Sequence, residues 1–214
     1  MLVKERMSQH PITVRPQTSL HEALRIMRDH KVRRLPVLDD KGKLVGIVSE
    51  KQLLYASPSP ATSLSVYELN YLMSKVTVDE LMTRNVVTVP EDCPLEEAAR
   101  IMADNEISGL PVMRGDMLVG MITESDLFKV FTEMLGARVF GLRVTIKVKE
   151  GHGVLAALTS RISELGADFI ALGTFWGDDP NVAEIAFKVK GIDRAKVEAI
   201  IDELDAELVD IREI

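Results

Sequence analysis

The chain has a single cysteine, Cys93, among its 214 residues. An intrachain disulfide is therefore impossible, and the scarcity of cysteine favours a cytoplasmic protein. Aromatic residues are also few, at 5%. No stretch approaches the roughly 18 consecutive apolar residues of a membrane-spanning helix, so we expect no membrane association. The first charged residues are not followed by an apolar run, which argues against a signal peptide.

Positive charge is in deficit as well. The formal net charge is −7 and the pI is about 5.2. Because nucleic-acid phosphates are bound by basic surfaces, this balance disfavours nucleic acid as a partner. The hydrophobic content of 46% is enough for a packed core. The four histidines are scattered, with no pair at the spacing of metal ligands, so we expect no metal site.

Motifs for catalysis are also missing. The sequence has no Gly-x-Ser-x-Gly segment, no glycine-rich phosphate loop with its lysine, and no clear pair of nucleophile and base. We therefore predict that the protein is not an enzyme. Cys93 precedes Pro94 at an expected helix start and is interpreted as structural. The alternative, a thiol whose pKa is lowered by the helix N-terminus, remains open.

An internal repeat is the main feature that the sequence does have. The segment that begins at Met7 returns about 75 residues later at Met82. Both copies contain Glu-Ala, Ile-Met, Leu-Pro-Val and Leu-Val-Gly in the same order, and the register shifts by one residue in the turn after Leu-Pro-Val. These matches begin at Glu22, Ile26, Leu35 and Leu44 in the first copy and at Glu97, Ile101, Leu110 and Leu118 in the second.

Each copy predicts a β-α-β-β-α unit. In the first, residues 12–14 are β-prone, and Ser19 with Glu22 fits a capping box at the start of a helix. Strands follow at 35–38, where Pro36 marks an edge or a strand start, and at 44–48, and a second helix begins at Ser49. One unit of about 60 residues buries too little surface to be secure alone, so we expect the two copies to share a core about a pseudo-two-fold axis.

The segment between the copies differs from both. Residues 56–63 are rich in serine and proline and predict a stiff connector. Ser65 with Glu68 forms a second candidate capping box, which opens a short helix that runs to about Met73.

From about residue 138 the pattern changes to β-α-β-β-α-β, the ferredoxin-like order. Strands are expected at 139–148, 169–176, 182–189 and 208–214. The first helix carries the apolar stripe Val154, Leu155, Leu158, Ile162 and Leu165 and ends at Gly166. The second helix, 192–204, has Val197, Ile200, Ile201 and Leu204 as its apolar face.

The repeat resembles a tandem pair of cystathionine-β-synthase-type (CBS) domains, also called a Bateman module. The resemblance rests on residues 32–37 with 44–49 in the first copy and on 107–112 with 118–126 in the second. It covers about residues 1–134 and implies an α/β fold. The expected boundaries are 1–60 for repeat 1, 61–79 for a linker with a short helix, and 80–134 for repeat 2.

Residues 138–214 resemble an ACT domain, a small regulatory module that commonly binds amino acids. Its turn often reads Asp-x-Pro-Gly-x-Leu and here reads Glu-Gly-His-Gly-Val-Leu, with a glutamate in place of the aspartate and a histidine in place of the proline. The candidate ligand loop is His152, Gly153, Val154 and Leu155. A CBS pair followed by an ACT domain is similar to the acetoin-utilisation B protein family.

In CBS pairs, the segment Gly-h-h-Thr/Ser-x-x-Asp, in which h is hydrophobic, commonly binds the ribose of an adenine nucleotide. The second copy keeps this pattern with Thr123 and Asp126, whereas the first has Ser49 and Gln52. Two vicinal hydroxyls can donate to the two oxygens of a carboxylate, and an amide lacks this pairing. The resemblance therefore places the ribose at Asp126.

Basic residues before Leu-Pro-Val often bind the phosphates in this family, because a guanidinium can donate two parallel hydrogen bonds. The first copy has Arg33 and Arg34 there, and the second has Ser108 and Gly109. We therefore predict one working site, with Asp126 and the arginine pair, and one weakened cleft, with Gln52 opposite Ser108. The base is expected near His10 and Ile12, with Met121 behind.

Two simpler interpretations remain open. Thr123 and Asp126 also suit a helix cap, and Arg33 with Arg34 also suits a solvated surface pair. The function that we expect is regulatory sensing of AMP, ADP, ATP or S-adenosylmethionine, without a further cofactor, by a cytoplasmic homodimer in acetoin utilisation or related metabolism. The alternatives are a structural partner protein, an amino-acid sensor that acts through the ACT domain, and an accessory to an enzyme of acetoin metabolism.

Overall fold

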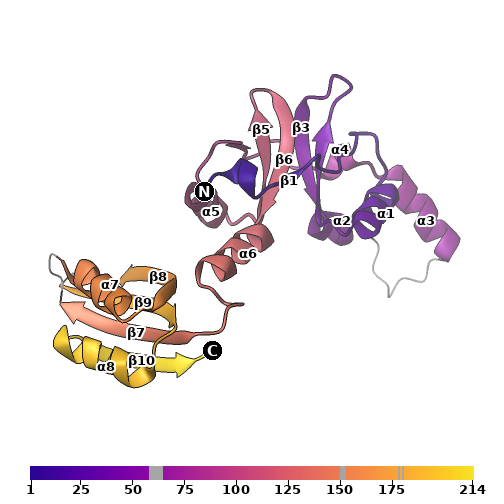
Figure 1. Ribbon diagram of the computed structural model, residues 1–214. Helices are drawn as coiled ribbons and strands as arrows, with labels where there is room; N and C mark the ends of the chain where they lie inside the picture. Colours follow the sequence, from indigo (N-terminus) through magenta and orange to yellow (C-terminus); the bar gives the residue numbers. More distant parts are fainter. Residues whose placement is uncertain (58–64, 150–152, 178, 180) are drawn as a thin grey trace. The chain divides into compact units, whose positions relative to one another are not determined.

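The computed structural model describes the chain except for residues 58–64, 150–152, 178 and 180 (Figure 1). The chain divides into two compact units, Met1–Leu127 and Phe128–Ile214. Most of the predicted connector 56–63 and the candidate ligand residue His152 lie outside the described residues.

The first repeat follows the predicted order of elements. Helix α1 (Leu20–His30) starts at Ser19, whose hydroxyl accepts the amide of Glu22 at 3.2 Å. Strands β2 (Arg34–Leu38) and β3 (Leu44–Ser49) form an antiparallel pair, and helix α2 (Glu50–Ala56) follows. Residues 12–14 do not form the expected strand. Only Val14 makes a bridge, parallel to Val37, and a turn follows at Pro16 and Gln17.

The second repeat has the same architecture. Strand β4 (Val89–Pro90) runs parallel to β5 (Gly109–Arg114), which is antiparallel to β6 (Met117–Thr123). Helices α5 (Leu95–Asp104) and α6 (Glu124–Met134) complete it. The registers correspond, since Pro36 pairs with Ile47 and Pro111 with Met121. Between the repeats, helix α3 (Val66–Lys75) begins with the predicted capping box.

The start of the chain completes the sheet of the second repeat. A short helical turn, η1 (Val3–Glu5), precedes strand β1 (Ser8–Gln9), which pairs with β6 and lies beside it in Figure 1. The strand order is β1-β6-β5-β4. The amide of Val3 donates to the carbonyl of Cys93 at 2.9 Å, and the Val3 side chain is fully buried. The first nine residues, which the sequence assigns to repeat 1, therefore pack with repeat 2, and Ser8 and Gln9 join its sheet.

The segment that precedes the second repeat packs, in turn, with the first repeat. Helix α4 (Val78–Leu81) carries Val78 and is followed by Met82, and both side chains join the core of the first repeat. Thr83 then bridges to Ile47 on β3. The two copies thus exchange their leading segments.

Two glycines show how closely these exchanged segments pack. A Cβ atom on Gly46 would overlap the side chain of Met82, and one on Gly120 would overlap the side chain of Met7. The repeated methionines and the repeated Leu-Val-Gly segments are therefore partners across the exchange. Each repeat accepts the methionine that precedes the other.

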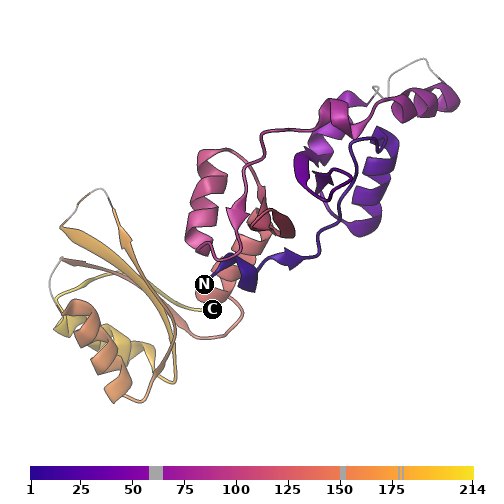
Figure 2. The same ribbon diagram turned by 90° about the horizontal axis from the view of Figure 1, so that it is seen from above.

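The second unit has the predicted β-α-β-β-α-β order. Its elements are β7 (Leu142–Lys149), α7 (Val154–Glu164), β8 (Asp168–Trp176), β9 (Val182–Lys190), α8 (Arg194–Glu203) and β10 (Glu207–Glu213). The strands are antiparallel in the order β10-β7-β9-β8, and Figure 2 shows both helices on one face of the sheet. Alternate strand residues such as Ile146 and Phe187 pack there against Leu158 and Ile162.

Two residues of the predicted helix stripe are not buried. Leu155 is 40% exposed and Leu165 is 45% exposed. Leu155 lies in the first turn of α7 and Leu165 is the residue after its last turn, so both lie at the ends of the helix. Gly166, which follows, has the left-handed conformation expected of a residue that terminates a helix, with φ of 78°.

Gly141 provides a test of packing in this unit. A Cβ atom there would lie 2.6 Å from the backbone oxygen of Val189 and 2.8 Å from Cδ1 of Ile170. Because Val189 belongs to the central strand β9, Gly141→Ala must displace backbone. We expect it to lower the free energy of unfolding by about 1–3 kcal/mol in urea denaturation. Gly177→Ala, which meets no atom within 4 Å, is the control, and equal losses for both variants would refute this explanation.

Candidate functional site

A cavity of about 600 Å³ lies where the two repeats meet. Such a volume is within the range of roughly 300–1,000 Å³ for small-molecule sites. Its basic lining residues are Arg33, Arg34 and Lys51, and its acidic ones are Glu50 and Glu106. The lining also includes the polar side chains of Ser49, Gln52, Thr83, Asn85 and Ser108. The cavity thus combines a cationic wall with several uncharged hydrogen-bonding groups.

Arg34 extends from one repeat to the other. It begins strand β2, and its guanidinium donates a hydrogen bond to the hydroxyl of Ser108 in the second repeat. Cδ of Arg34 lies over Gly109, where a Cβ atom would meet it at an ordinary contact distance of 3.4 Å. Burial lowers the pKa of Arg34, and the nearby charge of Arg33 lowers it further, while Glu124 opposes the shift. An arginine remains charged under these conditions, so the cavity keeps a half-buried cation.

Gln52 has a structural role in the same cavity. Its Oε1 accepts hydrogen bonds from the amide and the hydroxyl of Ser49, both at 2.8 Å, which completes a capping box at the start of α2. Its Nε2 donates to the hydroxyl of Thr83 at 3.0 Å. The amide that replaces the acid therefore joins the helix to the exchanged segment, and both ends of the side chain are engaged.

Asp126 caps α6 in the corresponding way. One carboxylate oxygen, Oδ2, accepts the amide of Thr123 at 3.1 Å and its hydroxyl at 2.7 Å. The capping interpretation of this pair is therefore confirmed. Ribose binding by the same pair stays a prediction.

The remaining predicted site residues do not line the cavity described above. Met121 is 7% exposed and pairs with Ser8. Ile47, which lines the cavity, is its counterpart in the first repeat and pairs with Thr83. Ile12 is half-buried against the first core. His10 is exposed, with a positive φ of 51°.

One part of the sequence-based site is wrong. Gln52 shares its cavity with Ser108 and Gly109, as expected, but Arg33, Arg34 and Lys51 line the same cavity, so it is not weakened at both ends. The reason is that Arg34 reaches Ser108 across the boundary between the repeats. Asp126 is not among the residues that line this cavity. The sequence did not predict Lys51 and Asn85 as lining residues. Comparison of the two copies could have found Asn85, because it occupies the position that corresponds to His10.

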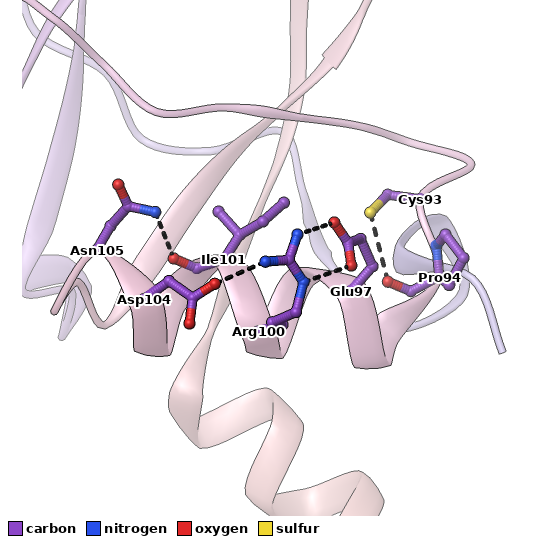
Figure 3. Close-up of polar contacts among 7 residues, drawn as sticks. All are labelled: Cys93, Pro94, Glu97, Arg100, Ile101, Asp104 and Asn105. Carbon is purple, nitrogen blue, oxygen red and sulfur yellow. Dashed lines mark hydrogen bonds and ion pairs between the residues drawn. The ribbon is translucent and has the colours of Figure 1, made fainter.

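Cys93 is a structural residue. It is buried, and its sulfur lies 3.4 Å from the carbonyl oxygen of Pro94 at the start of α5 (Figure 3). Burial raises the pKa of the thiol, and the carboxylates of Glu97, Asp92 and Glu96 raise it further. The alternative of a thiol activated by the helix N-terminus is therefore wrong. Figure 3 also shows Arg100 between Glu97 and Asp104, an exposed network on the same helix.

A second cavity, of about 410 Å³, lies beside the predicted ligand loop of the second unit. Gly153, Val154 and Leu155 line it together with Thr174 and Trp176. Three of the four predicted loop residues are thus together, and the fourth, His152, is outside the described residues. Ligand binding at this loop stays a prediction.

The described residues form neither a metal-binding cluster nor a membrane-spanning helix. No group of three or more His, Cys, Asp or Glu side chains in this part of the chain is arranged to hold a metal ion. None of the helices described above combines the length and the apolar character needed to cross a bilayer.

Comparison with known families assigns the repeats. The sequence model of the CBS domain matches residues 3–59 and again residues 78–133. The chain belongs to the CBS domain family. The tandem pair and the mixed α/β fold predicted from the sequence are therefore confirmed.

Solved CBS structures resemble this one over part of its length. The CBS domain pair of protein MJ0100 in complex with 5′-methylthioadenosine and S-adenosyl-L-methionine is 34% identical, with a TM-score of 0.52, and the match covers 64% of this chain and 98% of that one. A protein of Vibrio cholerae assigned to acetoin utilization (AcuB) is 31% identical, with a TM-score of 0.53 and coverage of 64% and 95%.

A third structure, CBSX2 in complex with AMP, is 32% identical, with a TM-score of 0.50 and coverage of 61% and 95%. Curated relatives differ widely in size. The matched segment spans 23% of the length of one such relative and 94% of another.

Proposed function

We propose that the CBS pair binds an adenine nucleotide and acts as a regulatory ligand sensor. The observation that carries this proposal is the cavity at the repeat boundary, with Arg33, Arg34 and Lys51 on its wall. The bound adenosine compounds in the MJ0100 and CBSX2 structures support the choice of ligand class.

The charges favour a ligand that carries phosphate. Three cations and two carboxylates line the cavity. Arg33 is exposed and has no ion-pair partner among the described residues, so its guanidinium is available to a phosphate. Arg34 is already held by Ser108, which places it without further ordering. We therefore assign AMP, ADP or ATP to this cavity in preference to phosphate-free adenosine compounds.

The cleft around Asp126 is proposed as a second adenosine site. There the ribose would lie at Thr123 and Asp126, and the base near His10, Ile12 and Met121. The repeat supports this, because every one of these positions corresponds to a lining residue of the Gln52 cavity, such as Gln52 for Asp126 and Ile47 for Met121. S-adenosylmethionine, which lacks phosphate, suits this cleft better, since a carboxylate can bind ribose without basic neighbours.

Titration calorimetry with AMP and with S-adenosylmethionine tests both assignments. For AMP, Arg33→Ala should weaken binding at least about 10-fold, which corresponds to about 1.4 kcal/mol, through the lost phosphate contact. The control Arg25→Ala removes a guanidinium that is 63% exposed on α1 and should leave AMP binding unchanged. Asp126→Asn keeps an acceptor for Thr123 and should weaken S-adenosylmethionine binding alone.

Each outcome bears on one proposal. If AMP binding is lost in Asp126→Asn and kept in Arg33→Ala, the nucleotide lies in the Asp126 cleft and the assignment to the Gln52 cavity fails. If the unmodified protein binds neither compound at millimolar concentration, the sensor proposal itself fails. The protein would then be a structural partner.

For the second unit we propose an ACT domain at residues 138–214. Its β-α-β-β-α-β order, its strand order and the cavity beside Gly153 support this assignment. A role in acetoin utilisation is supported by the likeness to AcuB. As units of the sequence repeat we propose 1–60 and 80–134, with a linker at 61–79, although the leading segment of each copy packs with the other copy.

A cytoplasmic homodimer is also part of the proposal. Leu54 on α2 and Phe128 on α6 occupy equivalent positions of the two repeats and are 57% and 67% exposed. Exposed apolar side chains at matching positions suit a symmetric contact between copies.

A further inference from the structure

A buried lysine lies on the sheet of the second unit. Lys188 on β9 is 3% exposed. Its ammonium has three donors, and its single hydrogen bond among the described residues is to the carbonyl oxygen of Gly136, at 3.1 Å. No carboxylate of the described residues lies within 4 Å of it. A buried ammonium without a counter-charge is costly, so this position favours an added anion.

The neighbouring strand adds a second cation. Arg143 on β7 is directly opposite Lys188 in the antiparallel ladder, an arrangement in which like charges repel. The carboxylate of Asp210 lies 3.0 Å from the Arg143 guanidinium, but the same carboxylate also binds Arg212. One carboxylate therefore serves two arginines, and Lys188 has no ion-pair partner within 4 Å among the described residues.

Both cations line a cavity of about 280 Å³. This cavity and the 410 Å³ cavity lie on opposite faces of the sheet. Successive side chains of a strand point to opposite faces, and Phe175 and Ala186 line this cavity, whereas their neighbours Thr174 and Ile185 line the other. Phe131, Leu135 and Phe175 supply apolar walls. At about 30 Å³ per water molecule, the volume suits a ligand of roughly ten non-hydrogen atoms, too small for a nucleotide.

We propose that this cavity binds a small monocarboxylate with an apolar body. The carboxylate accepts hydrogen bonds from Lys188 and Arg143, and the apolar body packs against Phe131 and Phe175. One negative charge is favoured over two because Glu184 also lines the cavity. This site is separate from the nucleotide cavity and does not depend on it.

Phenylacetate is the probe, with phenylacetamide and acetate as its controls. Phenylacetamide keeps the shape and loses the charge, whereas acetate keeps the charge and loses the apolar body. In NMR titrations of the full chain, phenylacetate should bind at least about 10-fold more tightly than either control. Lys188→Met should remove this preference. Lys190→Met, on the same strand and 58% exposed, should not change it.

The proposal fails if phenylacetamide binds as well as phenylacetate, or if Lys188→Met binds phenylacetate as the unmodified protein does. Ala186→Leu keeps the lysine and fills the cavity, so it tests the site even if Lys188→Met does not fold, and undiminished binding in Ala186→Leu refutes it. A second copy of the chain on this face is the competing occupant. Sedimentation that shows a dimer dissociated by Lys188→Met, with no phenylacetate binding, would overturn the proposal in favour of that contact.

Discussion

Val3→Asp should destabilise the second repeat, although Val3 precedes the first. Its side chain is fully buried, and its amide donates to Cys93 beside α5. The substitution removes the burial of a valine and places an unpaired carboxylate in the same site. We expect the free energy of unfolding to fall by at least about 3 kcal/mol.

Hydrogen exchange locates the effect. The amides of β5 and β6 should lose protection before those of β2 and β3, because Val3 and β1 pack with the second repeat. Lys4→Asp, whose side chain is exposed in the same segment, controls for the new charge and should leave exchange nearly unchanged. Faster exchange confined to β2 and β3 would contradict the segment exchange.

In the Phe187→Ala variant, the second unit should unfold at a much lower denaturant concentration than in the unmodified protein. Phe187 is 2% exposed in the central part of β9, and its ring centroid lies 5.9 Å from that of Phe169 with the planes tilted by 54°. Truncation loses this aromatic contact and leaves a cavity among strands that cannot close over it. The expected loss is about 3–5 kcal/mol.

The single tryptophan makes this measurement specific. Trp176 ends β8, so its fluorescence follows the second unit alone. The control Phe140→Ala removes a ring that is 72% exposed and should shift stability by no more than about 0.5 kcal/mol. Equal shifts for the two variants would show that Phe187 is not part of a tightly packed core.

Local patterns predicted most of the secondary structure. Ser65 with Glu68 and the glycine at 166 mark helix ends by their own chemistry, so they are found without any tertiary information. The strand expected at 12–14 failed because a β-prone composition does not supply a partner along its whole length. The pairing of β1 with β6 was out of reach, since it joins residues more than about 100 positions apart and no local signal encodes it.

The site was also predicted only in part, because local patterns identify its residues but not all of their tertiary contacts. Comparison of the copies singled out Arg33 and Arg34 and the change from acid to amide at Gln52. The cavity that Arg34 lines depends on its hydrogen bond to Ser108 of the other repeat, which is a tertiary property. Lys188 was missed because a lysine in an alternating strand is normally exposed, whereas its burial and its bond to Gly136 depend on tertiary structure.

The exchange of leading segments also constrains how this protein is made. On the ribosome, β1 emerges about 110 residues before β6, its only strand partner among the described residues. A nascent chain that ends after the first repeat leaves Val3 uncovered, and it also lacks Val78 and Met82 for its own core. Neither repeat can therefore complete its fold before the other has been synthesised. A split gene that encodes the repeats separately should yield halves that are soluble only when they are produced together.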